Sequence, residues 1–256
     1  MSRFPLEIVA SGVATLRVAS DEAPYFGDDI VDALSAAVRE VEAGTTIHAV
    51  ILVGGSRHFS AGAARESLLR PDARETILSY AARLPEIILS FPIPCVAAME
   101  GHAIGGGLSL GLWCDMAFLA EESLYGANFM ALGFTPGLGS TLVLEEAFGA
   151  FQAREMLLAG RLWKGRELKT GPLSHAILPR AAVWPRSLAL AEELAEVPRE
   201  ALGLLKAALS TPRRERLAAA NAREQQMHAR LFAGRATQGE IAERYTEKEK
   251  KTHDRH

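Results

Sequence analysis

The sequence has few of the groups that anchor a metal, a membrane or a nucleic acid. Its only two cysteines, Cys95 and Cys114, lie in apolar segments without metal-ligand spacing, and we expect both to be buried as small hydrophobic residues. No apolar run approaches the roughly 20 residues that span a bilayer. The N-terminus alternates like a strand and lacks the apolar core of a signal peptide. The net charge of −3 argues against nucleic-acid or anionic-membrane partners. We therefore expect a cytoplasmic protein with no metal or cofactor.

The order of apolar segments predicts an α/β fold. Short strands are expected within 6–18 (broken at Ser11–Gly12), 47–55, 95–101, "DMAFLAEES" and "SLYGAN". Helices are expected near 30–41 (with Asp28 as a cap), 74–90, 106–114, 141–158, 184–196, 198–210 and 212–234, and a loop over "GGSRHFSAGAARESLL". Strand–helix alternation followed by helices indicates an α/β core, which we place at 1–195. We expect residues 196–256 to form a helical C-terminal region, with the charged tail "TEKEKKTHDRH" mobile.

Two glycine-containing turns follow buried strands. One is "FSAGA" at 59–63, and the other contains Gly105, Gly106 and Gly107. Where a strand turns into a helix, the first N–H groups lack intrahelical partners, and glycine allows a ligand to approach the backbone closely. Each turn alone can be explained as a tight connection. Two of them in equivalent positions favour a pair of donors aimed at one oxygen, as in the oxyanion hole of acyl chemistry.

Over nearly its whole length the chain resembles the crotonase (enoyl-CoA hydratase/isomerase) superfamily. The matching segments are "HFSAGA", "PCVAAMEGHAIGGGLSLGLWCDMAFLAEES", "YGANFMALGFTPGLGST" and "AREMLLAGRLWKGRELKTGPLSHAILPR". The resemblance implies a crotonase fold with a stacked ββα core. It also implies that the backbone N–H groups of Ala63 and Gly106 form an oxyanion hole for a thioester carbonyl. It further implies a homotrimer whose C-terminal helices help to close the sites.

Both glutamates that hydratases of this superfamily use are missing. The first would follow the last glycine of the GGG run by two residues, and that position is Ser109. The second would lie where the chain has Phe129. Adding water to a double bond needs a base for the water and an acid for the carbon. Hydratase activity is therefore not expected, unless Glu66 or Glu86 compensates.

A reaction that needs an oxyanion hole but no base is decarboxylation, and an apolar wall such as Phe129 favours the neutral product. "ESLYGANFMALGFTPGLGST" and "MEGHAIGGGLSLGL" resemble the decarboxylating crotonases of polyketide β-branching. That resemblance implies conversion of a 3-methylglutaconyl thioester on an acyl carrier protein into a 3-methylcrotonyl thioester. It also assigns His228, in "REQQMHARLF", as proton donor or carboxylate-orienting group. From the residues alone, a histidine in so polar a helix can equally be solvated surface.

Members of that subgroup carry a lysine, or a tyrosine and a lysine, in the helical lid after the first turn. Here no lysine precedes Lys164. Tyr80 is the first candidate to replace it, as a proton donor, and Arg65 or Arg83 could bind a carboxylate bidentately. His58 and His102 flank the two turns, and either could face the substrate or simply fill its loop.

The carrier of the acyl group, coenzyme A or an acyl carrier protein, stays open at this point. An acidic carrier protein could dock on a basic patch that includes some of Arg65, Arg70, Arg74 and Lys164. Two other functions remain open as well. One is an acyl-CoA isomerase or hydrolase of the same superfamily, and the other is a catalytically silent binding subunit.

Overall fold

A six-stranded sheet forms one half of the structure. The computed structural model describes residues 5–27, 29–70, 73–169 and 175–231. The sheet has the strand order β1-β2-β3-β5-β7-β10, in which β1 and β2 form an antiparallel pair and all other neighbours are parallel. Its strands are β1 (Leu6–Ala10), β2 (Val13–Arg17), β3 (Ala49–Val53), β5 (Cys95–Met99), β7 (Met116–Ala120) and β10 (Ala176–Leu178).

A second, four-stranded sheet continues the first. Its order is β4-β6-β8-β9, and its strands are β4 (His58–Ser60), β6 (His102–Ile104), β8 (Leu124–Gly126) and β9 (Leu162–Lys164). The strands β3, β5 and β7 of the large sheet are each followed directly by a short strand of the small one, and then by helix. This repeated arrangement confirms the predicted stacked ββα core.

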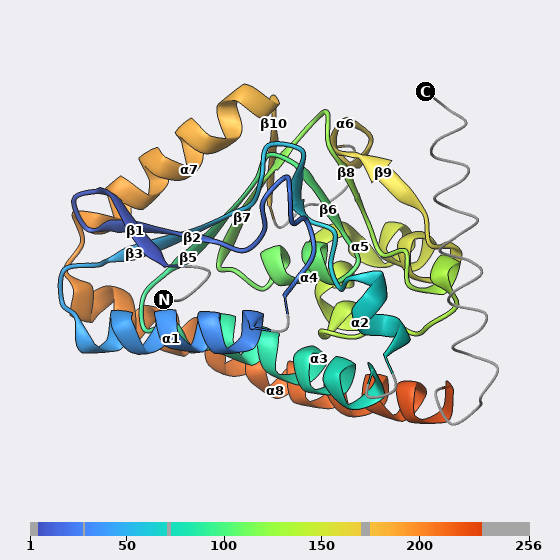
Figure 1. Cartoon of the computed structure of the whole chain (residues 1–256). Helices are drawn as coiled ribbons and strands as arrows, with labels where there is room; N and C mark the ends of the chain where they lie inside the picture. Colours follow the sequence, from blue (N-terminus) through green and yellow to red (C-terminus); the bar gives the residue numbers. More distant parts are fainter. Residues whose placement is uncertain (1–4, 28, 71–72, 170–174, 232–256) are drawn as a thin grey trace.

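Helices cover both faces of the large sheet (Figure 1). The helices are α1 (Ile30–Ala43), α2 (Arg65–Leu69), α3 (Ala73–Ser90), α4 (Gly106–Leu112), α5 (Ser140–Ala159), α6 (Gly165–Leu168), α7 (Arg180–Ala195) and α8 (Arg199–Leu231), with a 3-10 turn at Met130–Leu132. Because side chains alternate along β3, Ile51 packs toward α7 while Leu52 joins the core under α1 and α3. No described helix has both the length and the apolarity needed to cross a membrane.

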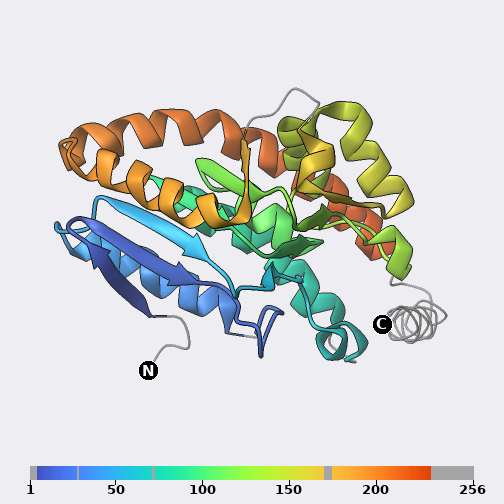
Figure 2. The ribbon, with the colours of Figure 1, turned by 90° about the horizontal axis from the view of Figure 1, so that it is seen from above.

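The predicted pair of helices at 198–210 and 212–234 is wrong, because α8 continues through Pro212. This helix extends along most of the molecule (Figure 2). Neighbouring elements hold it on both sides of the proline. Lys206 binds the Asp115 carboxylate at 2.6 and 2.7 Å, and Arg213 donates to the last carbonyls of α4, among them that of Leu112 at 3.0 Å. These contacts hold α8 in place on both sides of the proline, where one intrahelical hydrogen bond is missing.

The segment predicted as a loop after β3 contains strand β4 and helix α2, since three residues of β4 pair with β6 and complete the small sheet. The proposed cap of α1, Asp28, lies outside the described residues, as does the charged tail; the residue before the helix is Asp29, which makes no side-chain cap. Both cysteines are buried and free, as expected.

Candidate active site

Three loops meet at one edge of the small sheet. They follow the parallel strands β4, β6 and β8, whose pairing aligns His58 with His102 and Ala103 with Tyr125. The carboxyl ends of parallel strands lie at the same edge, so the two glycine turns and the segment after Gly126 come together there. The sequence-predicted turns therefore share one site.

Ala63 supplies the first unbonded N–H. It forms a parallel bridge with Phe26, in which the N–H of Phe26 donates to the carbonyl of Gly62 at 2.8 Å. Gly62 has φ +81°, a conformation that side chains rarely adopt, and this turns the chain at that point. The N–H of Ala63 has no hydrogen-bond partner among the described residues.

Gly106 supplies the second unbonded N–H, as the first residue of α4. Gly105 before it has φ +58° and donates its own N–H to the carbonyl of Gly126 at 2.8 Å. Within the described chain Gly106 N has no acceptor. The two turns are in contact, since a Cβ on Gly62 would lie only 3.1 Å from the nitrogen of Gly106.

Ala63 and Gly106 both line a cavity of about 290 Å³. Its deep part is apolar and buried, and it includes Leu68, Phe129 and Leu138. Phe129 packs edge-on against Phe134, with ring centroids 5.6 Å apart. No Asp, Glu, Lys or Arg lines this cavity within the described part of the chain; its polar groups are hydroxyls, imidazoles and the amide of Asn128.

His228 projects into this cavity from α8 and is only 2% exposed. The backbone carbonyl of Glu224 lies 3.0 Å from Nδ1 and can only accept a hydrogen bond, so Nδ1 carries a proton. Burial lowers the pKa of His228, and the bond to Glu224 opposes that shift. The lowered pKa favours the neutral imidazole at pH 7. His228 is therefore not a solvated surface residue, which was the alternative that its polar helix also permitted.

The other predicted site residues divide into two groups. Tyr80 and His102 line the cavity, as does His58. Nδ1 of His102 accepts a hydrogen bond from the N–H of Leu124 at 3.0 Å, so the proton of the neutral ring is on Nε2. This bond also ties His102 to strand β8. Arg83 is exposed and does not line the cavity. Arg65 opens α2, but its side chain lies outside what the structure describes.

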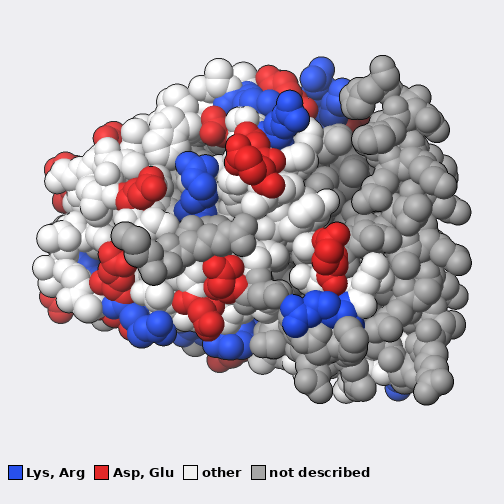
Figure 3. All heavy atoms as spheres, in the orientation of Figure 1, with Lys and Arg blue, Asp and Glu red and all other residues white. Residues whose placement is uncertain are grey.

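Among the described residues, the two hydratase positions and the two glutamates that could compensate supply no acid to the cavity lining. Ser109 is fully buried, and its hydroxyl oxygen lies 2.7 Å from that of Ser140, away from the lining. Glu66 is exposed, Glu86 is half-buried, and neither lines the cavity. The face seen in Figure 3 carries interspersed acidic and basic side chains. Arg70 and Lys164 are both exposed, whereas the side chain of Arg74 lies outside the described set.

A second cavity, of about 280 Å³, lies between β7, α5 and α8. Its wall includes His175, whose two ring nitrogens are buried and make no hydrogen bond in the described structure. The ring packs edge-on against Phe148, at 4.8 Å between centroids. Burial lowers the pKa of His175 from 6.5 to about 4.

We expect His175 to make the protein sensitive to acid. The unfolded chain binds a proton at this side chain below pH 6.5, but the folded protein resists it down to about pH 4. The free energy of unfolding should therefore fall as the pH falls through this window, by up to roughly 1.4 kcal/mol per pH unit. Urea unfolding of wild type and His175→Ala at a series of pH values measures the difference. Parallel curves for the two proteins would exclude His175 as the cause.

Comparison with known proteins agrees with this geometry. The family model described as enoyl-CoA hydratase/isomerase matches residues 10–255. The chain is 35% identical over 235 residues to the bacillaene synthase decarboxylase PksI of Bacillus subtilis, covering 91% of this chain and 94% of that protein.

Solved structures show the same relationship. One described as part of a dehydratase/decarboxylase enzyme couple in polyketide β-branching has a TM-score of 0.83 at 32% identity, covering 93% of this chain and 97% of its own. The ECH2 decarboxylase domain of CurF from Lyngbya majuscula has a TM-score of 0.83 at 31% identity, covering 95% and 99%. The chain therefore has the crotonase fold and belongs to the enoyl-CoA hydratase/isomerase family.

Proposed function

We propose that this protein decarboxylates a 3-methylglutaconyl-type thioester carried on an acyl carrier protein and gives a 3-methylcrotonyl-type thioester. One observation carries the proposal: Ala63 and Gly106, whose backbone N–H groups have no partner in the described structure, line the cavity together with a buried histidine, and no described carboxylate does. The similarity to PksI and to the decarboxylase domain of CurF supports the same chemistry.

In the proposed reaction the thioester oxygen accepts hydrogen bonds from the N–H groups of Ala63 and Gly106. The bond between the carboxylate and C4 breaks, CO2 leaves, and the electron pair becomes a dienolate whose charge rests on that oxygen. Each such donor typically contributes about 2.7–4 kcal/mol to transition-state stabilisation. The apolar wall around Phe129 disfavours the charged carboxylate more than neutral CO2. Loss of CO2 therefore needs no base.

His228 completes the reaction as the proton donor. Burial favours its neutral imidazole, but a bound carboxylate favours the imidazolium form through its charge, so that Nε2 takes up a proton from the solvent. Protonated Nε2 first pairs with the carboxylate and then delivers its proton to C4 of the dienolate, which forms the C–H bond of the methyl group. Tyr80, on the cavity wall, is proposed to orient the carboxylate in place of the missing lysine.

Mass spectrometry of a 3-methylglutaconyl carrier protein incubated with the enzyme tests this proposal. We expect the acyl group to lose the mass of CO2, and a crotonyl carrier protein to remain unhydrated under the same conditions. The coenzyme A thioester, assayed in parallel, shows which carrier is preferred. Thioester binding without turnover would instead favour a silent binding subunit and would exclude the proposal.

We also propose that the protein is a homotrimer, in which the C-terminal region from residue 196 onward contributes to assembly and to closing the site. Large apolar side chains remain exposed on α5 and α8, including Phe151 at 77%, Leu158 at 74% and Leu209 at 61%. Burial of such side chains against other copies is the expected arrangement. Light scattering should give the mass of three chains.

A further inference from the structure

The segment Gly137–Gly139, between the 3-10 turn and α5, has a strained backbone. Leu138 has φ +60°, and among the described residues it is the only non-glycine with positive φ. For a leucine this conformation costs on the order of 1–3 kcal/mol, and it persists only where surrounding contacts impose it. The segment therefore needs anchors.

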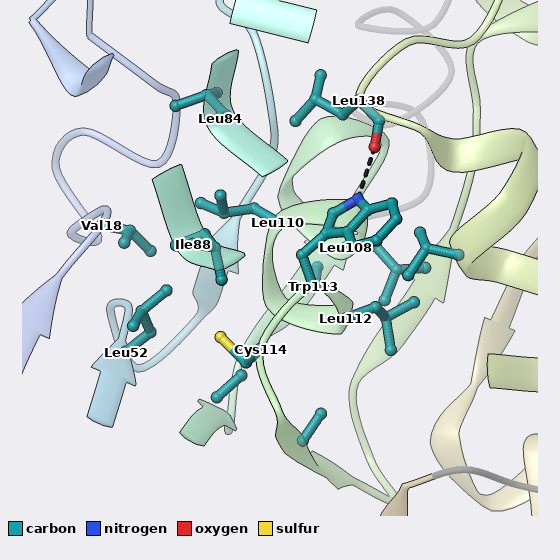
Figure 4. Close-up of a cluster of buried hydrophobic side chains, with 14 of the residues drawn as sticks. Val18, Leu52, Leu84, Ile88, Leu108, Leu110, Leu112, Trp113, Cys114 and Leu138 are labelled. Atoms are coloured by element: carbon teal, nitrogen blue, oxygen red, sulfur yellow. Dashed lines mark hydrogen bonds between the residues drawn. The ribbon is translucent and has the colours of Figure 1, made fainter. Parts of the chain in front are cut away.

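Several hydrogen bonds provide those anchors. The indole Nε1–H of Trp113 donates to the carbonyl of Leu138 at 2.7 Å (Figure 4). The hydroxyl of Ser140 donates to the carbonyl of Gly137. From α8, the carboxylate of Glu224 accepts the N–H of Gly139 at 2.8 Å. The segment is thus fixed from α4, from α5 and from α8.

Glu224 is the anchor that α8 contributes, and only 2% of it is exposed. Its second oxygen accepts the N–H of Thr141 at 2.9 Å and the hydroxyl of Thr141 at 2.7 Å. The carboxylate therefore binds the N-terminus of α5, where the helix dipole favours negative charge. Burial raises its pKa, and these three donors oppose that shift.

The anchored segment touches both halves of the proposed catalytic machinery. A Cβ on Gly106 would lie 3.5 Å from the Leu138 side chain. At the other end, a Cβ on Gly137 would lie 3.4 Å from Cε1 of His228. Glu224 is also connected to His228 directly, because its backbone carbonyl accepts the Nδ1–H at 3.0 Å.

We propose that Glu224 is a positioning residue for the reaction. Through the segment Gly137–Gly139 it sets the distance between the imidazole of His228 and the N–H of Gly106. Leu138 acts as the spacer, and its strain is maintained by the Glu224 and Trp113 anchors. The catalytic consequence rests on the proposed function, since it assumes that His228 delivers the proton.

Glu224→Gln tests this inference with little change in shape. An amide NH2 replaces one of the two accepting oxygens, so at least one N–H of Gly139 or Thr141 loses its acceptor. We expect kcat to fall about 10²-fold, the size of effect that a misplacement of about 1 Å can produce, with KM little changed. Thr141→Val removes a single donor and should give a smaller loss of kcat.

Lys206→Met is the matched control on the same helix. Lys206 is 4% exposed and pairs with Asp115, away from the cavity lining. We expect this variant to lower Tm but to keep the kcat of wild type when both are assayed below their unfolding transitions. Equal kcat values for Glu224→Gln and Lys206→Met at matched loss of Tm would overturn the inference.

A second measurement does not depend on the reaction. In wild type the Nδ1–H of His228 should give a slowly exchanging proton signal in NMR, because it is buried and bonded to a carbonyl. The signal should shift or exchange faster in Thr141→Val and Glu224→Gln and stay unchanged in Lys206→Met. An unchanged signal in all three variants would overturn the positioning role, whereas a wild type that releases no CO2 would overturn only the proposed function.

Discussion

Replacing His228 by alanine is expected to lower the kcat for product formation by at least 10²-fold, within the ~10²–10⁴-fold range of a lost general acid. Alanine has no group that can pair with the substrate carboxylate or protonate the dienolate, and no Asp, Glu, Lys or Arg lines the cavity in the described structure to replace it. The two N–H groups remain, so thioester binding should persist. A dienolate that lacks its donor must wait for water, which the apolar wall excludes.

Single-turnover assays with mass detection separate loss of CO2 from protonation, and a run in deuterated water reports the origin of the new proton. His175→Ala is the control, because His175 is also a buried histidine but lies in the second cavity. It should keep the kcat of wild type at neutral pH. Wild-type turnover in His228→Ala would exclude His228 as the donor.

Local sequence patterns predict the parts of the fold that depend on neighbours along the chain. The buried strands and the glycine turns after them follow from short apolar runs that end at glycine, and the ββα order follows from their spacing. The continuity of α8 through Pro212 cannot be predicted from local patterns, because it depends on distant contacts. Arg213 donates to a carbonyl of α4, and Arg214 donates to a carbonyl of α3. These partners lie about 100 residues or more away along the chain.

The same limit applies to the site. The two glycine turns could be predicted from the local sequence, and the family resemblance pointed to Ala63 and Gly106 within them. The burial of His228 could not be predicted in this way, because it depends on how α8 packs against α3 and α5. The Glu224 anchor joins positions 85 residues apart, and nothing around Glu224 in a polar helix indicates it. For Leu138 the flanking glycines, Gly137 and Gly139, were the only local signal of an unusual turn.

Gly107→Ala is expected to cause the largest loss of any conservative change near the site. Helix propensity alone predicts a gain of about 1 kcal/mol, since Gly107 is the second residue of α4. Packing makes the expected net effect on the free energy of unfolding a loss instead of a gain. The new Cβ would lie 2.2 Å from the carbonyl oxygen of Ser60, which is backbone and cannot rotate away. Either α4 or the turn that carries Ala63 must move, so we expect destabilisation of about 1–3 kcal/mol or more.

Catalysis should suffer as well as stability, because the contact joins the two turns that carry the proposed oxyanion donors. We expect kcat to fall by 10²-fold or more when these donors separate. Gly106→Ala is the matched comparison: its Cβ would meet Phe26 at 3.3 Å and Leu138 at 3.5 Å, and both contacts are side chains that can adjust. We therefore expect Gly107→Ala to have a much lower Tm than Gly106→Ala, and a much lower kcat when both are assayed below their unfolding transitions. Equal losses in the two variants would mean that the spacing between the turns does not control the reaction, and that crowding of the cavity does.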